Sequence, residues 1–177
     1  MGKLFPDVIG DKIRVTKQDV FFFGTPAGDA RFSEKRLPVW ADHRERFIYG
    51  IPGSLGSENQ GRGFKIADDS RGPEFDPTTG ERVVSAEGLK IVREYLGFRF
   101  PAMKDAPLIE TQVCQYENTP DNHFIIDRHP AADHVWLVGG GSGHGFKHGP
   151  ALGEMLAGLV MEGRDADPLL RLRRFRK

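Results

Sequence analysis

A run of glycines, histidines and a lysine carries the residue types best suited to chemistry. Residues 136–159 read WLVGGGSGHGFKHGPALGEMLAGL, with five glycines from Gly139 to Gly145 and with His144 and Lys147 among or after them. The apolar residues before the run indicate a strand, and those after it indicate a helix. A glycine-rich turn before a helix lets a ligand reach backbone N–H groups and the positive end of the helix dipole. The pattern therefore predicts either a ligand site or only a tight turn.

The spacing in this run matches neither of the common phosphate-binding loops. In GxGxxG the last position falls on His144, Phe146 or His148, depending on the first glycine. GxxxxGK[ST] is absent, because Lys147 is followed by a histidine. A carboxylate or a planar polar ring suits such a turn as well as a phosphate. Lys147 would lie where a helix start disfavours positive charge, so it either faces solvent or pairs with a substrate carboxylate.

Metal-dependent and serine-dependent hydrolysis have weaker support from the spacing. His144 and His148 are four residues apart, but the chain has no HExxH, and a single cysteine cannot build a structural zinc site. Ser142 misses the GxSxG elbow, because His144 occupies the last position. We predict no metal site. Hydrolysis through the two histidines remains an alternative that chelators would abolish.

Composition limits the class of protein and its partners. The 177 residues contain equal numbers of acidic and basic side chains, 25 each, so we expect neither nucleic acid nor an anionic membrane as partner. No signal peptide and no membrane-spanning run is evident, and Cys114 is the only cysteine. These features predict a cytoplasmic location. The basic residues 171–177 indicate a solvated end.

The order of expected elements predicts an α+β fold. Strands are expected in residues 11–26 (in two pieces), 46–52, 61–69 and 134–141. Two further strands are expected in residues 106–130, on either side of a turn at 119–122. The strand at 134–141 is apolar and β-branched, which is typical of a strand buried on both faces. Helices are expected over 85–97 and 149–163. This order predicts a mixed, largely antiparallel sheet followed by a terminal β-turn-α unit, with a seam near residues 107–111.

Two segments together resemble a known family. CQYENTPDNHFIIDRHP (residues 114–130) and VWLVGGGSGHGFKHGPALGEMLAGL (residues 135–159) are similar to the C-terminal part of the monomeric sarcosine oxidase and N-methyltryptophan oxidase family. Its members are FAD-dependent amine oxidoreductases of the D-amino-acid oxidase superfamily. The resemblance extends through RFIYGIP, GRGFKIA and the helix at 85–97. The segments FIIDRHP and GGGSGHGF are also reminiscent of fructosyl-amino-acid oxidases.

The resemblance implies a role for each matching residue. Cys114 is similar to the cysteine that carries flavin covalently through its 8α-methyl group, and Lys65 to the lysine that assists dioxygen reduction. Lys147 matches the residue that holds the substrate carboxylate, and Tyr49 and Tyr116 match walls of the substrate pocket. The loop implied to lie over the flavin ring consists of Gly141, Ser142, Gly143, His144, Gly145, Phe146 and Lys147.

The chain also departs from the family pattern. Asp68 and Asp69 stand where the sarcosine oxidases have a histidine shortly after the lysine of GFK, which leaves the substrate open. The Rossmann strand–GxGxxG–helix with which family members begin has no counterpart. The resemblance therefore implies a portion of the substrate (catalytic) domain in residues 1–108 and the C-terminal part of the FAD-binding domain in 109–177.

The expected function is part of a flavin-dependent oxidase. It would move a hydride from an amino acid or N-methyl amino acid to FAD and then pass electrons to O2, giving H2O2. Without the Rossmann half, which a partner would have to supply, we expect the isolated chain to be inactive. The alternative is a non-catalytic remnant or interaction domain that self-associates through an exposed face.

Overall fold

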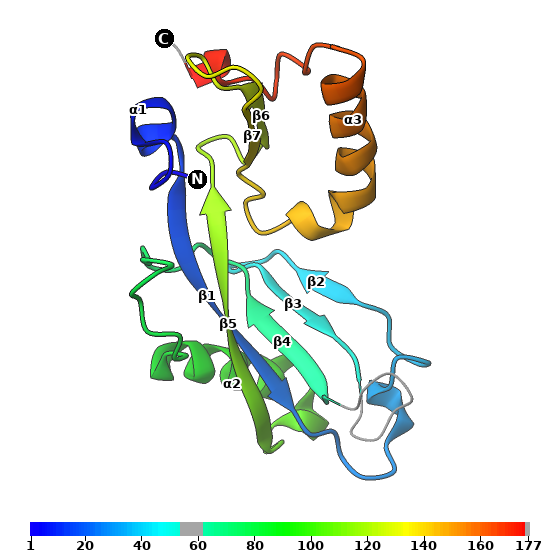
Figure 1. Cartoon of the computed structure of the whole chain (residues 1–177). Helices are drawn as coiled ribbons and strands as arrows, with labels where there is room; N and C mark the ends of the chain where they lie inside the picture. The colour runs from blue at the N-terminus through cyan, green and yellow to red at the C-terminus, as the bar shows by residue number, and fades with distance from the viewer. Residues whose placement is uncertain (54–61, 176–177) are drawn as a thin grey trace. The chain divides into compact units, whose positions relative to one another are not determined.

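The computed structural model describes residues 1–53 and 62–175, and the chain folds into two compact units (Figure 1). Unit 1 comprises Met1–Thr16, Glu74–Asp76 and Gln115–Lys177. Unit 2 comprises Lys17–Pro73 and Pro77–Cys114. Two of the boundaries fall inside long strands, between residues 16 and 17 of β1 and between 114 and 115 of β5. The assignment of 1–108 and 109–177 to two family domains stays a prediction.

A five-stranded sheet is the main structural element of unit 2. Its strands are β1 (Arg14–Phe23), β2 (Trp40–Asp42), β3 (Ile48–Ile51), β4 (Phe64–Asp68) and β5 (Leu108–Asn118), in the order β2-β3-β4-β1-β5. The pairs β2–β3, β3–β4 and β4–β1 are antiparallel. β-branched and aromatic side chains are frequent in β1 and β3, as the pleated surface of a strand favours.

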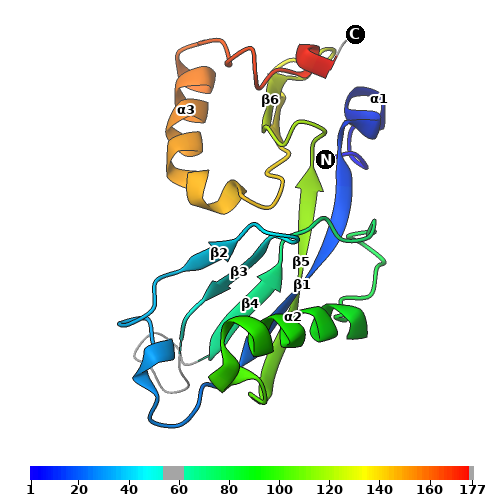
Figure 2. The same cartoon turned by 180° about the vertical axis from the view of Figure 1, so that it is seen from behind.

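Helix α2 (Ala86–Arg99) covers one face of this sheet, as Figures 1 and 2 show. It begins after Ser85, whose hydroxyl accepts a hydrogen bond from the Gly88 amide at 2.9 Å. The Asp19 carboxylate on β1 in turn accepts from both the amide and the hydroxyl of Ser85. The buried core between helix and sheet consists of Phe21, Phe23, Phe32, Ile48, Phe64, Ile66, Val92, Leu96, Met103 and Ala106.

Among the described residues of unit 2, no helix lies over the opposite face of the sheet. Side chains alternate along β1 and β4, so Val20, Phe22 and Ala67 point away from α2 and form a smaller cluster of their own. Tyr49 and Cys114 pack against this cluster and are only partly buried. One face therefore holds the core, and the other presents polar and reactive side chains.

Unit 1 is built around an antiparallel ribbon of β6 (Ile125–Arg128) and β7 (Trp136–Gly139). Ile125 and Leu137 pack on one side with Ile9, which ends the short helix α1 (Pro6–Ile9). On the other side Ile126 packs with Leu159 of α3 (Gly149–Met161). The ribbon thus lies between α3 and the segment that contains α1.

The structure confirms the α+β class and the largely antiparallel sheet, and corrects some local expectations. Residues 14–23 form one continuous strand instead of two pieces, because both of its faces find apolar partners. β2 was not expected from its sequence. The strand at 134–141 is not buried on both faces, since Val138 in the two-stranded ribbon is 40% exposed.

Of the described residues, no helix has the length and apolarity to span a membrane.

Of the basic residues 171–177, expected to be a solvated end, residues 171–175 are largely packed against β6, and residues 176 and 177 lie outside the described part of the chain. The Leu170 carbonyl accepts from the Ile126 amide at 2.8 Å, and Asp127 accepts from the Leu172 amide at 2.8 Å. Leu172 and Phe175 add apolar contacts beside Ile125 and Leu137. Charge composition alone could not reveal this, because the apolar residues between the arginines provide the anchor.

We predict that Leu96→Ala destabilises unit 2 by about 2–5 kcal/mol, because a fully buried side chain leaves a cavity. Lys90→Ala, an exposed change on the same helix, is the matched control and should stay within about 0.5 kcal/mol. Chemical denaturation followed by circular dichroism measures both. Equal effects of the two changes would contradict the packing of α2 described here.

Candidate functional site

The glycine run forms a strained turn between β7 and α3. Gly140, Ser142 and Gly143 all have positive φ values, of 69°, 46° and 85°. Such values are common for glycine but costly for serine, by about 1–3 kcal/mol. The short 3-10 helix η4 (Gly145–His148) follows and leads into α3, whose first turn has no side-chain cap.

Ser142 offsets its backbone strain with a buried hydrogen-bond network. Its side chain is almost fully buried, and its Oγ accepts from the Thr119 amide at 3.2 Å and donates to the Gly140 carbonyl at 3.2 Å. The Ser142 amide donates to the Glu117 carbonyl at 2.9 Å. The Ser142 hydroxyl therefore stabilises the turn, and its hydrogen bonds go to backbone groups of the protein.

Tyr116 and Gly143 are in contact within unit 1. A Cβ on Gly143 would overlap the Tyr116 ring, so only glycine allows both the ring position and the positive φ there. Gly143 itself is exposed. The structure thus brings one predicted wall of the substrate pocket against the predicted flavin loop.

His144 is held by the turn that precedes β6. Its Nε2 lies 3.0 Å from the Asn122 carbonyl, and its ring contacts Phe124 and His148 edge to face. These contacts orient the ring toward the protein. Within residues 1–53 and 62–175, His, Cys, Asp and Glu side chains form no group of three that could hold a metal ion.

Phe146 and Lys147 project from η4. Phe146 is 101% exposed, and Lys147 is also exposed, with no carboxylate within ion-pair distance among the described residues. Gly141 and Gly145 lie next to each other and to the Phe124 ring. An ammonium that makes no ion pair with the described residues is available to an anionic ligand.

Three predicted site residues lie on the helix-free face of the sheet in unit 2. Lys65 Nζ is 5.2 Å from the Tyr49 ring centroid, a cation–π contact. Tyr49 and Cys114 both pack on the Val20–Phe22–Ala67 cluster. Lys65 is half-buried, and no ion pair to it occurs in the described part of the chain.

Asp68, one of the departures from the family pattern, faces the other way. Its position alternates with Lys65 and Ala67 along β4, which places it on the α2 side. There it forms an ion pair with Arg46 at 2.5 Å and accepts from the Ser70 amide at 2.9 Å. Asp68 therefore does not take the place of a site histidine beside Lys65.

The predicted site residues thus form two groups, one in each unit. Unit 2 holds Tyr49, Lys65 and Cys114, and unit 1 holds Tyr116 with the loop 141–147. The sequence did not identify the residues that support the loop. Thr119 and Asn122 were recognised only as turn residues, although their hydrogen bonds hold Ser142 and His144.

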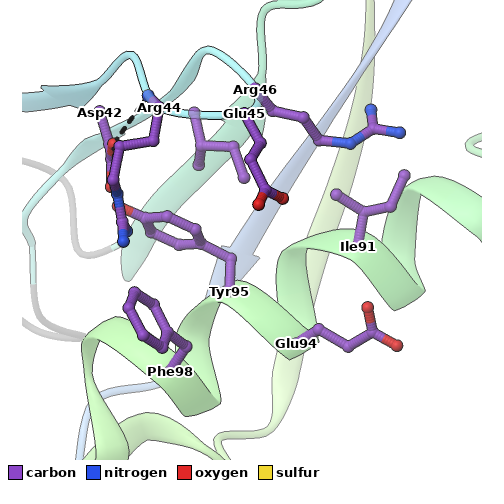
Figure 3. A pocket seen from close by; sticks show the side chains of 9 residues that line it. Asp42, Arg44, Glu45, Arg46, Ile91, Glu94, Tyr95 and Phe98 are labelled. Atoms are coloured by element: carbon purple, nitrogen blue, oxygen red, sulfur yellow. Dashed lines mark hydrogen bonds and ion pairs between the residues drawn. The ribbon is translucent and has the colours of Figure 1, made fainter.

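A pocket of about 420 Å³ lies on the α2 side of unit 2 and was not predicted (Figure 3). Figure 3 shows Tyr95 and Phe98 rising from α2 toward the segment with Asp42 and Arg44. Arg44 binds Asp42 through two nitrogens, and the Tyr95 hydroxyl donates to Asp42 at 2.9 Å. The charges of Asp42 and Arg44 are therefore paired with each other. Together with the hydrogen bond from Tyr95 on α2, this ion pair stabilises the β2–β3 connection.

Electrostatics in this pocket follow from those contacts. The Arg44 guanidinium, with a smaller contribution from Tyr95, holds the pKa of the Asp42 carboxyl well below its usual range. Desolvation, helped by the hydrogen bond to Asp42, raises the pKa of Tyr95 to about 12. Both shifts favour a neutral phenol that donates to a charged carboxylate.

Comparison with known proteins gives consistent matches along the chain. The family model described as "FAD dependent oxidoreductase" matches residues 2–159. A monomeric sarcosine oxidase from Streptomyces avermitilis is 31% identical over 164 residues, covering 91% of this chain and 42% of that protein. The human peroxisomal sarcosine oxidase is 39% identical over 127 residues, covering 70% of this chain and 31% of that protein. The chain therefore spans less than half the length of these relatives.

Solved structures share the fold. The L-proline dehydrogenase of P. horikoshii superposes with a TM-score of 0.74 at 23% identity, over 99% of this chain and 43% of that one. Amadoriase II, a fructosamine oxidase from Aspergillus fumigatus, superposes with a TM-score of 0.73 at 23% identity, over 93% and 39%. At these identities the likeness concerns the fold alone.

We predict that Gly143→Ala destabilises unit 1 by about 1–3 kcal/mol, because a side chain is strained at this φ and meets the Tyr116 ring. Gly153→Ala, in the middle of α3 with open space around it, is the control and should stabilise by up to about 1 kcal/mol. Urea denaturation of both variants checks the pair. A neutral Gly143→Ala would mean that the turn is not held as described.

We predict that stability falls as pH rises from 10 toward 12, partly through Tyr95. The raised pKa means that the fold keeps the phenol neutral, so its contribution is complete below the unfolded value of 10.0 and is lost as pH passes about 12. Tyr95→Phe should flatten this part of the profile, and ultraviolet titration should lose the component near pH 12. An unchanged titration in Tyr95→Phe would refute the assignment.

Proposed function

The chain belongs to the FAD dependent oxidoreductase family, and from this premise we propose that it forms part of a flavin-dependent oxidase acting on the C–N bond of an amino acid or N-methyl amino acid. The observation that carries the proposal is the helix-free sheet face of unit 2. It presents a partly exposed thiol, an ammonium without an ion pair in the described residues and a tyrosine, at Cys114, Lys65 and Tyr49. These are the types of group that flavin attachment, oxygen chemistry and substrate binding require.

The residues of the two units fit a flavin on chemical grounds. When bound, FAD would accept a hydride from the carbon next to the amine nitrogen and would pass the electrons to O2, giving H2O2. Cys114 would hold the cofactor by a thioether to its 8α-methyl group, for which a partly exposed thiol is needed. Gly143 is exposed, so a flat ring would approach the loop backbone there, while the side-chain positions of Gly141, Gly143 and Gly145 face Phe124 and Tyr116.

The two lysines would each stabilise a different negative charge. Lys65 would place a positive charge where negative charge develops on oxygen, and its cation–π contact with Tyr49 holds the ammonium without neutralising it. Lys147, exposed and unpaired among the described residues, would bind the substrate carboxylate. Tyr49 and Tyr116 would form apolar walls for the substrate, and the start of α3 would favour negative charge on the flavin.

The substrate class is proposed from the relatives' names and from this charge pattern. The curated relatives are named for sarcosine and, in one case, L-saccharopine, and solved neighbours are named for fructosamine and proline. Sarcosine, L-saccharopine and proline are amino acids with a secondary amine, and fructosamine is an amine of a sugar. A small amino-acid-like amine, with O2 as second substrate, therefore fits Lys147 and the two tyrosines.

The proposal includes a partner, because the dinucleotide part of FAD needs a binding segment of its own. We expect FAD to need a dinucleotide-binding segment, supplied by a partner, and the chain alone to be inactive, in a cytoplasmic location. Exposed Phe146, Val160 and Met161 favour contact with such a partner or with a second copy. They equally favour the second candidate, a non-catalytic interaction domain that keeps this fold without flavin.

Incubation with FAD, followed by a visible spectrum before and after acid precipitation, tests the proposal. The N-terminal segment of a sarcosine oxidase relative is added in a parallel sample. In that sample a flavin band that stays with the precipitated chain is expected, and Cys114→Ser should release it while keeping the fold. Ser142 and the loop should be unaffected by this change.

Lys147→Met provides the matched control, because it alters the substrate site without touching the thiol. It should keep the flavin band and raise the substrate KM by about tenfold or more, since a charged contact is lost. A band that washes away would remove the covalent role of Cys114. Absence of any band, with the N-terminal segment present, would overturn the flavin proposal in favour of the interaction domain.

A further inference from the structure

We propose that Arg174 and Asp121 are positioning residues that hold the glycine loop through the turn before β6. Nothing in the family resemblance assigned a role to either residue. Arg174 lies in the C-terminal strap (residues 167–175), which includes residues 171–175 of the basic segment that was expected to be a solvated end. The strap and the loop both belong to unit 1.

Arg174 is bound more completely than a surface arginine. Its side chain is 10% exposed. Its Nε and Nη2 donate to the two Asp121 oxygens at 2.7 and 3.2 Å, and Nη2 also donates to the His123 carbonyl at 3.0 Å. Bidentate binding of a carboxylate fixes direction as well as distance. The strap itself is anchored on β6 by the backbone hydrogen bond between Leu170 and Ile126.

Asp121 and His123 belong to the turn that Arg174 stabilises. The Asp121 carboxylate accepts from the His123 amide at 3.1 Å, and Asn122 between them has a φ of 61°. The His123 carbonyl also accepts from the Thr119 hydroxyl at 2.8 Å. One carbonyl oxygen is therefore shared between the guanidinium of the strap and Thr119.

The same turn makes the hydrogen bonds that hold the glycine loop. The Thr119 amide donates to the buried Ser142 hydroxyl, and the Asn122 carbonyl lies 3.0 Å from His144 Nε2. A Cβ on Gly140 would also meet the Thr119 methyl group, so turn and loop are packed closely. Arg174 is thus connected to Ser142 and His144 through one short turn.

It follows that the strap limits how far the loop can move. Without Arg174, Asp121 and the His123 carbonyl lose their common partner, and the strained turn at Asn122 loses its support. Ser142 and His144 would then be held less tightly. The consequence for flavin rests on the function proposed above, whereas the consequence for the loop does not.

Amide hydrogen exchange of the whole chain without flavin, followed by NMR, tests the inference. Arg174→Met and Asp121→Asn should each speed exchange of the Ser142 and His144 amides by about tenfold or more, as expected when a hydrogen bond to a charged group is lost. The double variant should add little to either single change, because both act through one pair. Arg173→Met, an exposed neighbour with the same change in charge, is the control and should leave both amides unchanged.

Two outcomes would overturn the inference. One is unchanged exchange at Ser142 and His144 in both variants. The other is faster exchange throughout β7 and α3 to the same degree, which would make the strap a general support of unit 1. Because the measurement contains no flavin, it stands whether or not FAD binds. With FAD binding established, Arg174→Met should also weaken flavin affinity, and Arg173→Met should not.

Discussion

The two-residue alternation of side chains along β1 and β4 is the constraint on which the sheet of unit 2 depends. It sends Phe21, Phe23, Phe64 and Ile66 under α2, where burial of large apolar side chains supplies most of the stability. The same alternation leaves Lys65 on the other face, half-buried beside the Tyr49 ring. A shift of β4 by one residue would turn Lys65 toward α2 and Phe64 away from it.

In unit 1 the corresponding constraint is conformational. A strand must pass directly into η4 and α3 through residues with positive φ, and the non-glycine member, Ser142, is stabilised by a buried network. This network draws its partners from Glu117 and Thr119, which lie far earlier in the chain. The loop is therefore held by tertiary contacts, although glycine makes its path possible.

Hydrophobic periodicity predicted most helices and strands well, since α2, α3, β5, β6 and β7 lie close to the expected ranges. It failed for the three-residue β2, which pairs with β3 and is too short to show a pattern. It also misjudged Val138, because the burial of a strand depends on what packs over it. Family resemblance selected Tyr49, Lys65 and Cys114 as site residues, and packing places all three on one face.

The sequence by itself determined the α+β class, the family and the residue types available for chemistry, because local propensity, glycine spacing and ordered motifs are properties of the chain. Only the tertiary structure decided that Asp68 faces α2 and binds Arg46, that the Ser142 hydroxyl supports the turn, and that Arg174 reaches Asp121. These contacts join residues far apart in the chain. Their formation depends on which faces meet after folding, and no local pattern encodes that.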